Sequence, residues 1–101
     1  MHIQRIASFA ALAEPAMKRA SIHNFRHKAM VGLLRELRVV RGLSQLDLAD
    51  AMDRPQSYVS SVERGRRGLD LLQALEFLDA MDVTFTEFAT ELEKRFRDAG
   101  I

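Results

Sequence analysis

The middle of this chain is divided at short intervals by residues that begin and end helices. Gly42 and Gly65 stand where a helix commonly ends in a left-handed residue. Ser44 and Asp47 have the spacing of a weak capping box. Pro55 stops one helix and can pre-set the first turn of the next. The sequence therefore predicts two short helices joined by a tight turn.

The rest of the chain continues this all-α pattern, with only two Pro and five Gly and no strand-like alternation. We expect a helix over about residues 26–41 before the short pair. Asp70 can cap a fourth helix, and Thr84 with Glu87 can form a capping box for a fifth. The predicted inward faces, in chain order, are Met30, Leu33, Leu34, Leu37 and Val40; Leu48, Ala49 and Met52; Val59 and Val62; Leu71, Ala74, Leu75, Phe77, Leu78 and Met81; and Phe85, Phe88, Leu92 and Phe96.

The segment before residue 28 is predicted to be an extension. Ile3 to Ala13 is Ala-rich and favours a helix that ends before Pro15. Part of it faintly resembles a signal peptide, but the apolar run is short, so a helix is the preferred interpretation. The expected organisation is an N-terminal extension at 1–27, a helical domain at 28–97 with the short helix pair at 44–64, and frayed residues at 98–101.

Composition excludes several classes of protein. The 101 residues suit one domain, and the absence of Cys excludes disulfides and thiolate metal sites. His23 and His27 are four residues apart but lack further ligands nearby, so we expect no metal. The serines lack a paired histidine and no glycine-rich phosphate loop occurs, which argues against an enzyme or a bound cofactor. With no membrane-length apolar run, we expect a cytoplasmic protein that makes no membrane contact.

Charge is distributed unevenly along the chain. The formal net charge is +1, but residues 1–27 carry +3, residues 28–67 carry +3 and residues 68–101 carry −5. A basic N-terminal part and an acidic C-terminal part favour one surface that faces a polyanion and another that faces elsewhere.

An ordered set of residues runs from 34 to 65 through the predicted helix pair. Its members are Leu34, Arg38, Arg41-Gly42-Leu43-Ser44-Gln45, Leu48-Ala49, Gln56-Ser57-Tyr58-Val59-Ser60 and Val62-Glu63-Arg64-Gly65. This set resembles the Cro/phage-repressor type of helix-turn-helix domain, also called the xenobiotic-response-element (XRE) or lambda-repressor-like family. The resemblance covers roughly residues 28–92 and implies a five-helix DNA-binding domain. Asp53 and Asp82 depart from it, because each replaces the glycine usual at its turn.

The resemblance implies that the third helix enters the major groove of double-stranded DNA and reads bases with its N-terminal end. Gln56 has suitable chemistry, because its amide can pair with adenine in bidentate fashion. Gln45 would bond a phosphate and brace Gln56, and Arg38 would pair with Glu63 to orient the third helix. The expected base contacts are Gln56, Ser57, Ser61 and Pro55. The expected backbone contacts are Gln45, Ser44, Tyr58, Ser60, Arg41, Arg54, Arg64, Arg66 and Arg67.

These observations predict a sequence-specific transcriptional regulator, a homodimeric repressor or autoregulator on a near-palindromic operator. The alternatives left open are a phage-type repressor, a controller of a restriction–modification operon, an antitoxin that binds a basic toxin through its acidic C-terminal third, and a protein-interaction adaptor. Leu72 either widens the core stripe or contacts a second subunit. The candidate dimer contacts are Leu72, Phe88, Leu92 and Phe96.

Overall fold

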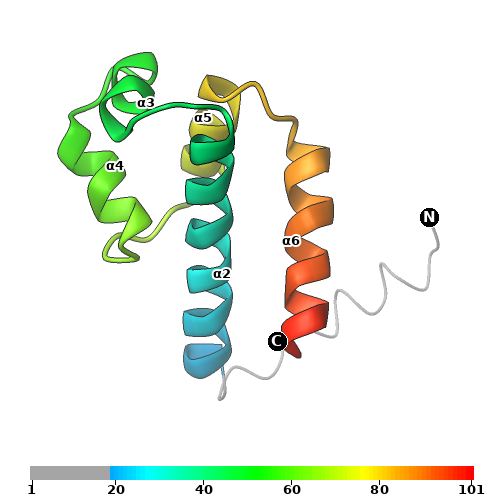
Figure 1. The fold of residues 1–101 in the computed structure, drawn as a ribbon. Coiled ribbons are helices and arrows are strands. Elements are labelled where there is room, and N and C mark those ends of the chain that lie inside the picture. Colours follow the sequence, from blue (N-terminus) through cyan, green and yellow to red (C-terminus); the bar gives the residue numbers. More distant parts are fainter. Residues whose placement is uncertain (1–18) are drawn as a thin grey trace.

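The computed structural model describes residues 19–101, and side chains from Phe25 onward, as five α-helices without a strand (Figure 1). The predicted all-α class is therefore confirmed. The predicted helix at Ile3 to Ala13 and the side chain of His23 lie outside the described residues. The helices are α2 (Arg19–Val40), α3 (Gln45–Ala51), α4 (Gln56–Glu63), α5 (Leu71–Ala80) and α6 (Phe85–Ala99). None of them is both long enough and apolar enough to cross a membrane.

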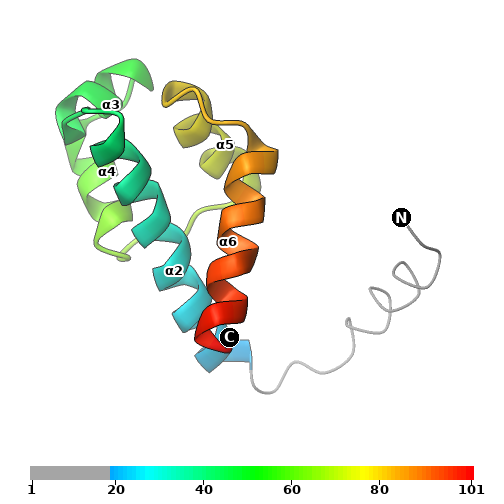
Figure 2. The ribbon, with the colours of Figure 1, turned by 45° about the vertical axis from the view of Figure 1, so that its right-hand side comes forward.

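The long helix α2 lies at the centre of the arrangement. It packs against α4 on one side and against α6 on the other, and α5 contacts both α3 and α6. Figures 1 and 2 show the short pair α3 and α4 at one edge of the molecule, with α6 at the opposite edge. The outer faces of α3 and α4 therefore point away from α6.

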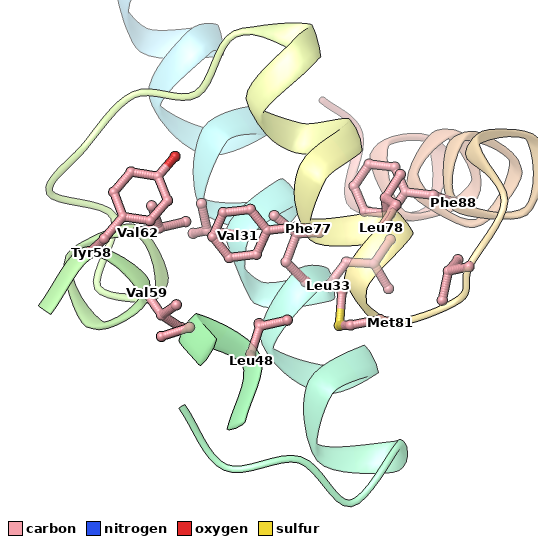
Figure 3. Close-up of a cluster of buried hydrophobic side chains, with 13 residues drawn as sticks. Val31, Leu33, Leu48, Tyr58, Val59, Val62, Phe77, Leu78, Met81 and Phe88 are labelled. Carbon is pink, nitrogen blue, oxygen red and sulfur yellow. The ribbon is translucent and has the colours of Figure 1, made fainter. Parts of the chain in front are cut away.

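One hydrophobic core joins the five helices (Figure 3). Every helix contributes to it, and the predicted anchors of α4, Val59 and Val62, are fully buried. The buried apolar members are Val31, Leu33, Leu34, Leu48, Ala49, Tyr58, Val59, Val62, Phe77, Leu78, Met81, Val83 and Phe88.

Three of the predicted inward positions are instead exposed. Val40 is the last residue of α2 and is 81% exposed. Leu71 lies in the first turn of α5, ahead of the segment that reaches the core, and is 59% exposed. Phe85 occupies the same position in α6 and is 48% exposed. An apolar residue at a helix end can thus match the helical period and still face solvent.

The predicted helix starts are present. The Ser44 hydroxyl accepts a hydrogen bond from the Asp47 N–H at 3.0 Å, and the Asp47 carboxylate accepts one from the Ser44 N–H at 2.9 Å. The bond from the Ser44 N–H to the Asp47 carboxylate lowers the pKa of Asp47. Thr84 and Glu87 form the equivalent box at α6, and Asp70 caps α5. Such caps satisfy N–H groups that have no partner within the helix.

Two helix boundaries differ from the prediction. Helix α2 begins at Arg19 rather than near residue 26, because no Pro or Gly interrupts its first turns. At the other end, residues 98–101 were predicted to fray, whereas the structure closes the end of α6 with hydrogen bonds. Gly100 adopts a left-handed φ of 73°, the Ile101 N–H donates to the Phe96 carbonyl at 2.9 Å, and the Arg26 guanidinium donates to the Ile101 carbonyl at 2.6 and 2.9 Å.

The two aspartates that replace turn glycines adopt the expected left-handed conformation. Asp53 has a φ of 55° and Asp82 a φ of 58°. Each follows the end of a helix, where a negative charge also opposes the helix dipole. Both effects make these positions less favourable than glycine would be.

We predict that Asp82→Gly raises the free energy of unfolding by roughly 0.5–1 kcal/mol, because glycine adopts positive φ without a Cβ penalty. Urea denaturation at equilibrium measures the change. Asp82→Ala is the matched control, since it removes the same charge but keeps the Cβ. An equal gain from both variants would attribute the effect to charge and contradict the conformational explanation.

Candidate nucleic-acid interface

Helices α3 and α4 are joined by a turn that the backbone closes itself. The Asp53 N–H donates to the Asp50 carbonyl at 3.1 Å, and the Arg54 N–H donates to the Ala49 carbonyl at 2.9 Å. Pro55 is the N-cap of α4, with extended backbone angles. The two helices pack directly against each other, so α4 is presented as a short helix after a tight turn.

A nearly buried ion pair fixes α4 on α2. The Arg38 guanidinium donates through Nε to one Glu63 oxygen at 2.6 Å and through Nη2 to the other at 3.0 Å. The two side chains are 10% and 3% exposed. Arg38 Nη1 also donates to the Leu43 carbonyl at 2.7 Å, and the bonds to Glu63 raise the pKa of Arg38. The structure thus contains the pair that the family resemblance implied.

Gln45 forms a hydrogen bond with this ion pair and not with Gln56. Its amide nitrogen donates to Glu63 Oε1 at 3.1 Å, and the side chain is half-buried. Arg35 approaches the same oxygen at 4.0 Å but is largely exposed. The expected brace between Gln45 and Gln56 is therefore replaced by a bond to Glu63, whose carboxylate is the stronger acceptor. A phosphate contact by Gln45 stays a prediction.

The start of α4 points to solvent and is polar. Pro55, Gln56 and Ser57 are exposed, whereas Ser60 and Ser61, further along the helix, are half-buried. No side chain caps α4, so its first N–H groups remain available to an external acceptor. Amide, hydroxyl and backbone N–H groups together can donate to base edges and phosphate oxygens.

Four of the five candidate arginines surround α4. Arg64 and Arg66 follow the helix and are exposed, and neither forms an ion pair within the described part of the chain. Arg54 and Arg67 lie over the ring of Tyr58. The fifth candidate, Arg41, is directed elsewhere, because its guanidinium donates to the Asp82 carbonyl at 3.0 Å, in the turn between α5 and α6.

Tyr58 is not the exposed phosphate ligand that the sequence predicted. It is 6% exposed, and its hydroxyl oxygen is buried without a hydrogen-bond partner. Its ring centroid lies 5.9 Å from that of Phe77, which belongs to α5 (Figure 3). The prediction failed because aliphatic spacing alone marked Val59 and Val62 as inward, whereas the ring of Tyr58 also turns inward, toward Phe77.

The candidate dimer contacts divide into buried and accessible residues. Phe88 is 4% exposed and belongs to the core, so its assignment as a dimer contact is wrong. Leu92 and Phe96 are half-buried and line an open groove along α6 together with Phe85. Leu72 is 73% exposed and does not widen the core stripe.

The role of Glu76 was not predicted from the sequence. This α5 residue forms an ion pair with Arg54 at 2.9 Å. Its partner lies 22 positions earlier in the chain, so no local spacing pattern could have revealed the pair. Only the packing of α5 against the short helices brings them together.

Fold and surface together define a helix-turn-helix protein, and comparisons agree. The helix-turn-helix family model matches residues 34–88. The structure is similar to an XRE-family like protein from Pseudomonas syringae pv. tomato str. DC3000, with a TM-score of 0.71, 34% identity, and coverage of 75% of this chain and 93% of that one. It is also similar to the restriction-modification controller protein C.Esp1396I, solved as a tetramer with its natural 35 base-pair operator, with a TM-score of 0.66, 24% identity, and coverage of 69% and 92%. Comparison with curated proteins gives no match.

The chain therefore belongs to the Cro/C1-type XRE helix-turn-helix family, and it is a DNA-binding transcriptional regulator.

We predict that Arg38→Met lowers the free energy of unfolding by about 3–5 kcal/mol, because it leaves the Glu63 carboxylate buried without its cation. Arg38→Met combined with Glu63→Gln should be less destabilised than Arg38→Met alone. Denaturant unfolding of Arg38→Met, Glu63→Gln and the double variant gives the coupling energy.

Arg95→Met is the matched control, because Arg95 pairs with Glu36 and Glu91 at a more exposed site. It should cost no more than about 1 kcal/mol. Equal losses at Arg38 and Arg95 would show that burial does not govern the contribution of the Arg38–Glu63 pair.

Proposed function

We propose that this protein binds a near-palindromic operator as a homodimer and represses transcription or regulates its own gene by occupying the promoter. The observation that carries the proposal is the outward, uncapped and polar N-terminal end of α4, which arginines flank. Gln56, with Ser57 and Ser61, reads base edges in the major groove, and Pro55 contacts a thymine methyl. Arg54, Arg64, Arg66 and Arg67 bind phosphates.

A homodimer is supported by the groove along α6. Phe85, Leu92 and Phe96 give it an apolar lining, and α6 lies at the edge of the molecule opposite α3 and α4 (Figure 1). A second copy joined there leaves both reading helices accessible. C.Esp1396I was solved as a tetramer on operator DNA, so a protein of this fold does assemble on its target.

The antitoxin and adaptor alternatives stay predictions. The acidic C-terminal third carries a net charge of −5, yet several of its carboxylates already have partners in this chain. Glu91 pairs with Arg95, Glu76 pairs with Arg54, and Glu87 caps α6. A basic partner would have to compete with these bonds.

The direct test is an in vitro selection of duplex DNA from a random library with the purified full-length protein. We predict enrichment of an inverted repeat whose half-sites are centred about one helical turn, or roughly 34 Å, apart. Symmetry and spacing follow from two α4 helices related by a two-fold axis. An enriched site without symmetry would contradict the dimer, and no enrichment would contradict sequence-specific binding.

We predict that Gln56→Ala weakens binding to the selected site by about 1–3 kcal/mol and leaves binding to random duplexes nearly unchanged, because base contacts confer specificity. Fluorescence anisotropy with both duplexes measures the two affinities. Lys94→Ala is the control, since Lys94 is exposed on α6 and should affect neither. Equal weakening on both duplexes would show that Gln56 contacts the backbone.

A further inference from the structure

Two candidate phosphate-binding arginines from opposite ends of α4 meet on one aromatic ring. The guanidinium carbon of Arg54, which precedes the helix, lies 4.4 Å from the Tyr58 ring centroid. That of Arg67, which follows the helix, lies 5.1 Å from the same centroid. The two cationic groups are therefore no more than 9.5 Å apart.

Two like charges this close repel each other, and free arginine side chains would separate. The electron-rich face of a tyrosine ring attracts cations and offsets part of this repulsion. Glu76 adds a carboxylate 2.9 Å from Arg54. Tyr58 itself is fixed, because it is buried in the core against Phe77. A rigid ring thus restricts two side chains that would otherwise be mobile.

The hydroxyl of Tyr58 has no part in this arrangement. Its oxygen is buried and has no hydrogen-bond partner, which is an unfavourable state for a polar group. The residue therefore contributes through its ring alone within the free protein. The variant Tyr58→Phe therefore tests the two groups separately, because phenylalanine keeps the ring and lacks the hydroxyl.

We propose that Tyr58 is a positioning residue for DNA-backbone recognition: its buried ring holds Arg54 and Arg67 together as a pre-arranged pair of cations for the phosphates of one DNA strand. This inference rests on the proposed DNA-binding function and deepens it. Holding the arginines in place before binding reduces the side-chain entropy lost when DNA arrives. Arg64 and Arg66, which have no such support, lose more freedom on binding.

The test measures affinity for a short mixed-sequence DNA duplex across a salt series, because phosphate contacts do not depend on sequence. We expect Tyr58→Leu to weaken binding about 5- to 30-fold, because two arginine side chains must then be ordered as DNA binds. Tyr58→Phe should bind as the unchanged protein does and be at least as stable. A loss with Tyr58→Phe equal to that with Tyr58→Leu would assign the effect to the hydroxyl and overturn the proposal.

The arginine variants separate positioning from packing. Arg54→Ala with Arg67→Ala should reduce the slope of log affinity against log salt by about 1.8 units, or about 0.9 for each phosphate contact. Adding Tyr58→Leu to that double variant should cause no further loss. If it still weakens binding by the full factor, Tyr58 acts through α4 packing and the proposal fails.

Two controls complete the design. Val59→Ala destabilises the same helix through a fully buried residue and should leave the salt slope unchanged. A lower slope with Val59→Ala would show that helix stability alone sets the slope, and would contradict the proposal. The unchanged protein must itself show a steep slope. A flat slope for it would overturn the proposed DNA-binding function, whereas a steep slope unaffected by the arginine variants overturns only the role of Tyr58.

Discussion

The position of α4 depends on one buried carboxylate. Glu63 accepts hydrogen bonds from Arg38 of α2 and from Gln45 of α3, and Arg38 also holds the carbonyl of Leu43 in the connection between those helices. Two charged side chains thus join three helices and a turn. Removing both charges from water costs free energy, so the pair is better understood as setting orientation than as a large net stabilisation. Apolar packing by Val59 and Val62 attaches α4 to the core, but non-directional burial does not fix its angle.

Eight residues of α4 serve two surfaces. The inward surface consists of Tyr58, Val59 and Val62, and the outward surface begins at Gln56 and Ser57. Eight residues make about two helical turns. A helix of this length has one buried face, and its N-terminal end remains exposed to solvent. Tyr58 contributes to both surfaces. Its ring packs in the core beside Phe77, and Arg54 and Arg67 lie over the same ring.

Local chemistry was predictable from the sequence, and long-range contacts were not. The caps at Ser44, Asp70 and Thr84, like the left-handed turn residues, depend on neighbours within a few positions and were identified correctly. The Arg38–Glu63 pair came from family resemblance. In contrast, the burial of Tyr58 depends on the contact of its ring with Phe77 of α5, which periodicity within a single helix does not reveal. The pairing of Gln45 with Glu63 and of Arg54 with Glu76 was missed for the same reason.

The exposure of Gln56 and Ser57 has an evolutionary consequence. Within the described part of the chain, neither side chain caps a helix, forms an ion pair or enters the core. Surface substitutions of this kind change folding stability by only about 0.5 kcal/mol. Mutations at these two positions therefore have little effect on folding, and selection can act on them through the DNA sequence that the protein binds. A duplicated copy of this gene can diverge in the DNA it recognises while the scaffold beneath stays the same.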